Sequence, residues 1–135
     1  IFLGRRLMGR FYHGDIHGKF MFAVQASDDP KFFIPSWSGF NEEDGLIEFL
    51  FKFDDLPNIK LGLATCRVKL GRFRKKLDEF FNKVDGYNEE MIAEEFKIQE
   101  SKVRGLLEWY ARYKIGVDIL CCVEKNGQCY LEGEC

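Results

Sequence analysis

The chain has 135 residues, a length that predicts one domain with a single core. Aromatic residues make up 16% of it and 14 residues are Phe, which excludes a disordered chain and favours a packed core with a buried interface. The net charge of -2 is unevenly placed: residues 56–84 carry eight Lys or Arg against two acidic residues, so they hold +6 and the rest holds -8. Such a segment is solvated, faces acidic parts of its own fold, or binds an anionic partner.

The N-terminal part predicts a β-hairpin. Residues 10–13 and 19–25 are rich in aromatic and branched side chains, which is typical of strands. Residues 14–18 lie between them and begin and end with glycine, as turns often do. The side chains of the second strand that we assign to the core are Phe20, Phe22 and Val24.

Residues 26–45 form the longest irregular stretch. Its Ser-Asp-Asp-Pro start predicts a single helical turn that ends at Phe33. Residues 34–44, which place Trp37 and Phe40 among small polar residues, are predicted to be a loop. A loop of this length in a small domain is uncommon unless it binds something or is packed down by its own aromatics. The candidate partner-binding residues are therefore Phe33, Trp37 and Phe40.

A third strand and a long helix follow. Residues 46–53 alternate, with Glu48 and Lys52 on one face. The other face carries Ile47, Phe49, Phe51 and Phe53. In residues 56–84 apolar side chains recur at spacings of three and four, which predicts one amphipathic helix about 43 Å long. Its apolar seam consists of Leu56, Ile59, Leu63, Cys66, Leu70, Phe73, Leu77, Phe80 and Val84.

The C-terminal part predicts a partner for that helix. A helical stretch opens at residue 88, is interrupted at 98–101 and resumes at Lys102. The resumed helix runs to about Glu124 and stops at Asn126-Gly127, and its spacing makes it the antiparallel partner of the first seam. Cys129, Tyr130 and Leu131 then form a strand at the sheet edge. In the alternative interpretation, residues 118–134 form a hairpin that turns at Asn126-Gly127.

The cysteines favour reduced thiols in an intracellular protein. There are five of them and they lack the paired C-x-x-C spacing of a zinc ribbon. No signal-peptide or transmembrane pattern precedes them. We therefore predict no metal site and no cofactor.

A short motif, Gly14-Asp15-Ile16-His17-Gly18, resembles the first metal motif of the calcineurin-like metallophosphoesterases. The resemblance implies Asp15 and His17 as metal ligands. The later motifs of that family are missing, and the chain has only two histidines, His13 and His17. A two-metal hydrolase needs more ligands than this. We therefore predict no catalytic residues and keep a metal-dependent phosphoesterase as a remote alternative.

Residues 89–108 resemble a helix-turn-helix unit. Ala93 matches its small residue and Ile98, Val103 and Leu106 match its core, whereas Lys97 stands where glycine is usual. The resemblance implies that the second helix enters the major groove. The candidate nucleic-acid-binding residues are Lys102 and Arg104, together with Arg72, Lys75 and Lys76 of the basic segment. Five glutamates between residues 89 and 100 oppose phosphate contact.

As a whole the chain is similar to small proteins of bacteriophages and large DNA viruses that have no agreed activity. The segments that carry this likeness are residues 9–14, 19–25, 28–29 and 107–112. It implies a viral accessory or assembly role, in an infected cell or a virion.

Together these patterns predict an α+β fold in which a small antiparallel sheet of three to four strands packs on an antiparallel pair of long helices. We expect one domain over residues 1–135, with residues 1–7 an upstream addition or a remnant. The predicted function is a non-enzymatic protein-interaction or assembly module that binds a protein partner or itself. Nucleic-acid binding is the alternative.

Overall fold

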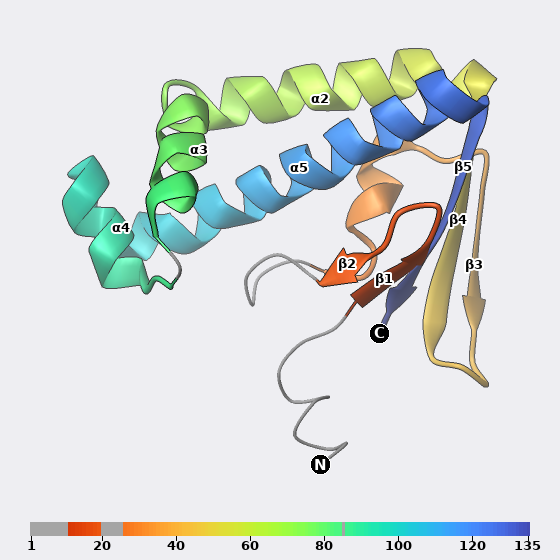
Figure 1. Ribbon diagram of the computed structural model, residues 1–135, viewed down its shortest axis with the longest axis horizontal. Helices are drawn as coiled ribbons and strands as arrows, with labels where there is room; N and C mark the ends of the chain where they lie inside the picture. Colours follow the sequence, from red (N-terminus) through yellow and green to blue (C-terminus); the bar gives the residue numbers. More distant parts are fainter. Residues whose placement is uncertain (1–10, 20–25, 85) are drawn as a thin grey trace.

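Two long helices cross one face of an antiparallel sheet and extend well beyond it (Figure 1). The structure is a computed structural model that describes residues 11–19, 26–84 and 86–135. Its strands are β1 Phe11–Gly14, β2 Gly18–Lys19, β3 Trp37–Asn41, β4 Leu46–Lys52 and β5 Gln128–Glu134, in the order β2-β1-β5-β4-β3. The predicted α+β class is confirmed. None of the described helices has the length and apolar character needed to cross a membrane.

The predicted N-terminal hairpin is present as β1 and β2. They pair antiparallel, with Phe11 opposite Lys19 and Tyr12 opposite Gly18. Tyr12 is buried and its hydroxyl donates to the carbonyl of Ala26 at 2.9 Å. The predicted core residues of the second strand, Phe20, Phe22 and Val24, lie outside the described residues.

β5 lies in the middle of the sheet, not at its edge as predicted. It pairs with β1, where His13 is opposite Glu132, and with β4 along its whole length. The side chains of Cys129 and Leu131 are fully buried. The alternating pattern of a strand identifies its buried face but not its neighbouring strands. The sequence therefore could not show which position β5 takes in the sheet.

β4 confirms the third predicted strand but is shorter than expected. Phe49 and Phe51 are completely buried, whereas Phe53, predicted on the same face, is 63% exposed. Phe53 begins a 3-10 turn, η2 Phe53–Asp55, because Asp55 Oδ2 accepts a hydrogen bond from the N–H of Lys52 at 2.8 Å. The strand therefore ends before Phe53 can reach the core.

The long helices are α2 Leu56–Leu70 and α5 Val103–Asn126, which run antiparallel (Figure 1). α5 ends as predicted, because Gly127 adopts the left-handed conformation with φ of 83°. The alternative hairpin over residues 118–134 is wrong. In α2 the buried members of the predicted seam are Ile59, Leu63, Cys66 and Leu70.

The prediction of a single helix over residues 56–84 is also wrong. The chain turns at Gly71 and continues as α3 Phe73–Lys83. Gly71 has φ of 53° and ψ of -133°, a conformation that side chains other than hydrogen disfavour. Leu70 and Leu77, on either side of the turn, are both buried. The regular spacing of apolar residues therefore continues across the turn, and the sequence pattern does not show that the helix ends there.

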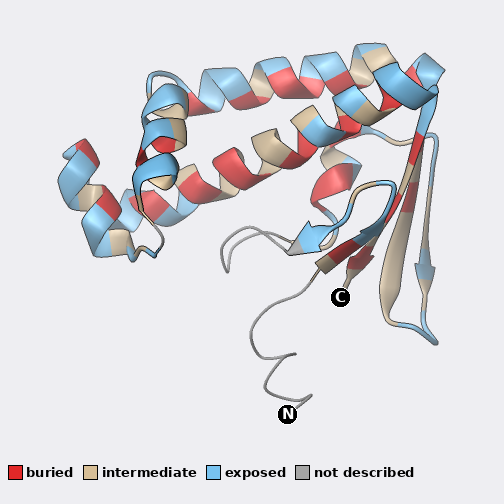
Figure 2. Ribbon diagram, viewed as in Figure 1, coloured by how far each residue is buried: buried red, intermediate tan, exposed pale blue. Residues whose placement is uncertain are grey.

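α3 packs with α4 Glu89–Phe96 and the first turns of α5 around a second hydrophobic cluster. Its buried members are Leu70, Leu77, Phe80, Ile92, Phe96, Val103, Leu107 and Tyr110. Partly buried Trp109 and Tyr113 of α5 contact both this cluster and the one beneath the sheet. Buried residues accordingly recur along the length of α5 (Figure 2).

Phe33 joins three elements. It ends the predicted single turn, η1 Asp29–Phe33, and is completely buried. A Cβ added to Gly62 of α2 would lie 2.6 Å from Phe33 Cδ1, and one added to Gly116 of α5 would lie 2.7 Å from Phe33 Cε1. The two glycines therefore form the socket that holds this ring.

Gly71→Ala should lower the free energy of unfolding by about 1–3 kcal/mol, because a Cβ is strained at this φ and ψ. The nearest atom to that Cβ, the Val68 carbonyl oxygen, is 4.0 Å away, so the loss would reflect conformation alone. Gly105→Ala, within α5 and facing open space, should instead raise stability by about 0.5–1 kcal/mol. Urea unfolding measures both, and equal effects would contradict the assignment of the turn.

Gly116→Ala should destabilise the fold by about 1–3 kcal/mol because it overfills the Phe33 socket. Phe33→Leu should relieve part of that cost, so a double-mutant cycle should show a coupling above about 0.5 kcal/mol. The same cycle with Gly105→Ala should be additive. Additivity in both cycles would mean that Gly116 does not hold the ring.

Candidate functional site

The segment predicted to be a loop contains an edge strand. β3 pairs with β4, from Trp37 opposite Leu50 to Asn41 opposite Leu46, and is the last strand of the described sheet. The turn that follows it is fixed by Asn41, whose Oδ1 accepts from the Asp44 N–H at 3.2 Å. The five residues of β3 carry no charge. An uncharged edge with unpaired backbone groups is a template for another strand.

The structure separates the three predicted partner-binding residues. Trp37 is 49% exposed and Phe40 is 58% exposed, whereas Phe33 is completely buried in the socket described above. Phe33 is therefore a core residue, and its prediction as a partner-binding residue is wrong. The Trp37 ring lies along its own strand, since a Cβ on Gly39 would lie 2.7 Å from the ring. The sequence identified Trp37 and Phe40 as candidates but placed them in a loop.

The face of the sheet that carries Trp37 bears carboxylates and is covered by none of the described helices. Figure 1 shows the helices on one face of the sheet. Trp37 lies on the other face, because Phe49 and Leu131, which alternate with its neighbours, point to the helices and are completely buried. Next to Trp37, across β4 and β5, lie Leu50 and Tyr130, and Glu48 is directly opposite Glu132. Partial desolvation and the nearby Glu132 and Glu48 carboxylates raise the pKa of Tyr130 to about 12. The surface thus combines apolar side chains with closely spaced negative charge.

The predicted nucleic-acid-binding residues lie at the opposite end of the long helices. Arg72 and Lys76 both lie near the Phe73 ring, at 5.0 Å and 6.0 Å from its centroid, and Lys75 is exposed. Lys102 ends the 3-10 turn η3 Glu100–Lys102, which leads into α5, and Arg104 lies in the first turn of α5; both are exposed. Each group is present at the surface, but the two groups belong to different helices.

Several other cations of the basic segment pack on aromatic rings of α5. Arg67 and Arg74 lie 5.9 Å and 5.8 Å from the Tyr113 centroid, and Lys69 lies 5.7 Å from that of Trp109. Cation–π contacts of this kind stabilise a cation that is close to a ring face. Part of the basic character therefore has a role in packing that the sequence did not reveal.

Helices α4 and α5 are joined by a tight turn. Asn88 caps the N-terminus of α4, since its Oδ1 accepts from the Met91 N–H. Lys97 caps the C-terminus and adopts the left-handed conformation with φ of 56°. The Ile98 N–H then donates to the Ala93 carbonyl at 3.1 Å. Lys97 thus takes the conformation that glycine usually supplies in a helix-turn-helix unit, at some cost in strain.

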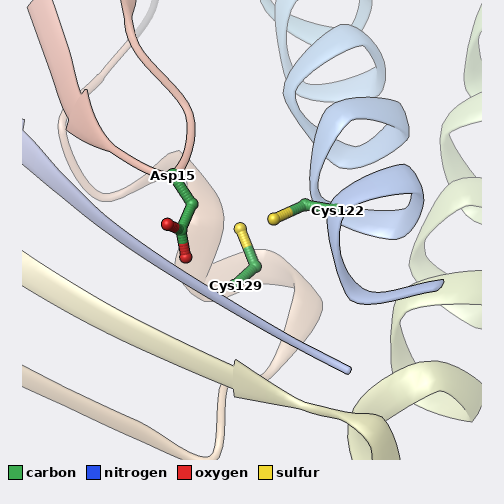
Figure 3. Close-up of side chains that lie close together, drawn as sticks. All are labelled: Asp15, Cys122 and Cys129. Atoms are coloured by element: carbon green, nitrogen blue, oxygen red, sulfur yellow. The ribbon is translucent and has the colours of Figure 1, made fainter. Parts of the chain in front are cut away.

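One group of metal-capable side chains occurs among the described residues, and the sequence did not indicate it. Asp15, Cys122 and Cys129 place a carboxylate oxygen and two sulfurs within 4.8 Å of one another (Figure 3). The group contains Asp15 of the phosphoesterase-like motif but not His17. Cys122 and Cys129 are near each other in sequence, but Asp15 is more than 100 residues from both, so no local spacing rule could have joined it to them.

Comparison of the chain with protein-family models, curated proteins and solved structures gives no match. Three features of the described structure indicate function: the exposed β3 edge, the α4–α5 turn and the Asp15 group. Of these, β3 combines the most features that indicate binding: an edge that no described strand covers, exposed aromatic anchors and neighbouring carboxylates.

Proposed function

We propose that this chain is a non-enzymatic protein-interaction module, in which β3 accepts an extended, positively charged segment of a partner protein as an additional strand. The observation that carries the proposal is the uncharged edge strand with Trp37 and Phe40 exposed on it. Strand addition uses the backbone of the edge for affinity and side-chain contacts for specificity.

The two aromatic side chains would contact different faces of the added strand. Trp37 is opposite Leu50 and Phe40 is opposite Ile47, so the two rings lie on opposite faces of the sheet. A strand added beside β3 would therefore be held between an aromatic ring above it and another below it. Large aromatic residues are the usual anchors of protein interfaces.

Charge indicates the chemistry of the partner. The turn after β3 contains the exposed residues Glu42, Glu43 and Asp44, and the open face adds Glu48 and Glu132. A segment with lysine or arginine at alternate positions would match these carboxylates, whereas an acidic one would be repelled. The resemblance to proteins of bacteriophages and large DNA viruses supports an accessory or assembly role for this module inside an infected cell.

A fluorescein-labelled peptide of alternating lysine and valine should bind, as measured by fluorescence anisotropy, and bind more weakly at high salt. Trp37→Ala should weaken it by about 30-fold, since loss of an interface anchor costs about 2 kcal/mol. Phe40→Lys should also weaken it, by charge repulsion and loss of the ring. Met91→Ala, 40% exposed on α4, is the matched control and should bind normally.

Two results would reject the proposal. One is equal binding of a matched peptide of alternating glutamate and valine. The other is a lack of peptide binding combined with self-association in light scattering that Phe40→Lys abolishes, because the edge would then belong to a second copy of the chain.

Nucleic-acid binding is the second candidate, favoured by the turn between α4 and α5. Left-handed Lys97 and the exposed start of α5 follow the path of a helix-turn-helix unit. Lys102 and Arg104 would face the groove, although the Arg104 side chain also approaches Glu108 to 3.9 Å. The acidic residues of α4 oppose phosphate contact and make this the weaker candidate.

If this second function holds, duplex or single strands should be retained in filter binding at about 50 mM salt. Replacing Arg72, Lys75 and Lys76 by Glu should weaken binding to all sequences and reduce its salt dependence, whereas Lys102→Ala with Arg104→Ala should blunt sequence preference. Lys31→Glu is the control, because Lys31 is exposed in η1 and belongs to neither group of candidate residues. No retention at this salt concentration would exclude the function.

A further inference from the structure

Three elements bring the Asp15 group together. Asp15 lies in the turn between β1 and β2, Cys122 in the last turn of α5, and Cys129 near the start of β5. Figure 3 shows the Cys122 sulfur directed toward the Cys129 sulfur, with the Asp15 carboxylate on the other side of Cys129. Cys129 is completely buried, Cys122 is half-buried and Asp15 is exposed. The group therefore extends from the core to the surface.

The backbone holds Asp15 in place. Its N–H donates to the Tyr130 carbonyl at 2.8 Å, and its Oδ2 accepts from the Tyr130 N–H at 2.8 Å. Gly14 makes this approach possible, since a Cβ there would lie 2.6 Å from the Tyr130 carbonyl oxygen, and its φ of 108° also favours glycine. These two hydrogen bonds keep the Asp15 carboxylate next to the two sulfurs.

The surroundings of the two sulfurs also suit a bound cation. Asn126 Nδ2 lies 3.6 Å from Cys122 Sγ and can donate to it, as outer groups do to metal-bound thiolates. The Asp15 carboxylate lies beside the buried Cys129 sulfur, so a cation bound between them would also neutralise the carboxylate.

From this geometry we propose that Asp15, Cys122 and Cys129 form a binding site for a divalent thiophilic cation of the zinc class. Two thiolates and one carboxylate match the ligand preference of zinc, which binds sulfur at about 2.3 Å and carboxylate oxygen at about 2.0–2.2 Å. The exposed side of Asp15 leaves a fourth position open to water. The site is separate from the β3 edge and does not depend on the protein-interaction proposal.

The cation would tie the N-terminal hairpin to the junction between α5 and β5. Both cysteines must lose a proton on binding, so affinity should increase with pH. The stabilising effect follows from mass action, because the unfolded chain does not hold the three ligands together. Added zinc should therefore raise the melting temperature of the reduced protein.

The test uses the full chain, reduced with a phosphine and kept free of oxygen, and titrated with Co(II). We expect one equivalent to bind, with a thiolate-to-cobalt charge-transfer band and the visible bands of a tetrahedral site, and zinc to displace it. Asp15→Asn keeps an oxygen that can accept from Tyr130 but removes the charge, and should weaken binding by at least about tenfold. Cys122→Ser should weaken the thiolate-to-cobalt charge-transfer band, because it removes one thiolate ligand.

Cys121→Ser is the matched control, because Cys121 is the exposed neighbour of Cys122 and lies outside the group. It should bind cobalt normally. Circular dichroism and thermal melting verify that each variant is folded, and Cys129→Ser is avoided because Cys129 is fully buried.

The proposal is overturned if the reduced protein shows no thiolate–cobalt band, or if Cys122→Ser or Asp15→Asn binds as tightly as the unmodified chain. It is also overturned if mass spectrometry finds a Cys122–Cys129 disulfide in protein that binds no cobalt after reduction. That result would assign the two thiols to a redox pair instead.

Discussion

The Phe33 ring between Gly62 and Gly116 is the contact on which the rest of the structure depends. It fixes η1 against both long helices at the point where they cross the sheet. Asp29, at the other end of η1, is buried and lies 3.5 Å from Arg112 of α5, and burial raises its pKa. Because η1 is held at both ends, the chain leaves it in a defined direction and reaches the sheet edge as β3.

α5 connects the two halves of the molecule. The cluster beneath the sheet and the cluster around α3 and α4 are both packed on it, and Trp109 and Tyr113 belong to the border of each. The cations that cover these rings are part of that border. As a result the two surfaces with binding features lie at opposite ends of α5, the β3 edge at one and the α4–α5 turn at the other (Figure 1).

The Asp15 group shows how a sheet can assemble chemistry that no local pattern contains. β5 is the central strand, so it receives the β1–β2 turn from one side and follows directly from α5. Its second residue, Cys129, is therefore within reach of both Asp15 and Cys122. A bound cation would add a further link between elements that already meet through hydrogen bonds and apolar packing.

The sequence by itself determined the α+β class, the turn through Phe33, the end of α5 at Gly127 and most of the seam along α2, because capping residues and apolar periodicity act locally. Only the tertiary structure decided the rest. Gly71 ends the first part of the predicted long helix, and the second part packs with α4 and α5 around the cluster that contains Phe80. The central place of β5, the burial of Phe33 and the meeting of Asp15 with two cysteines depend on which elements become neighbours, and no spacing along the chain encodes that.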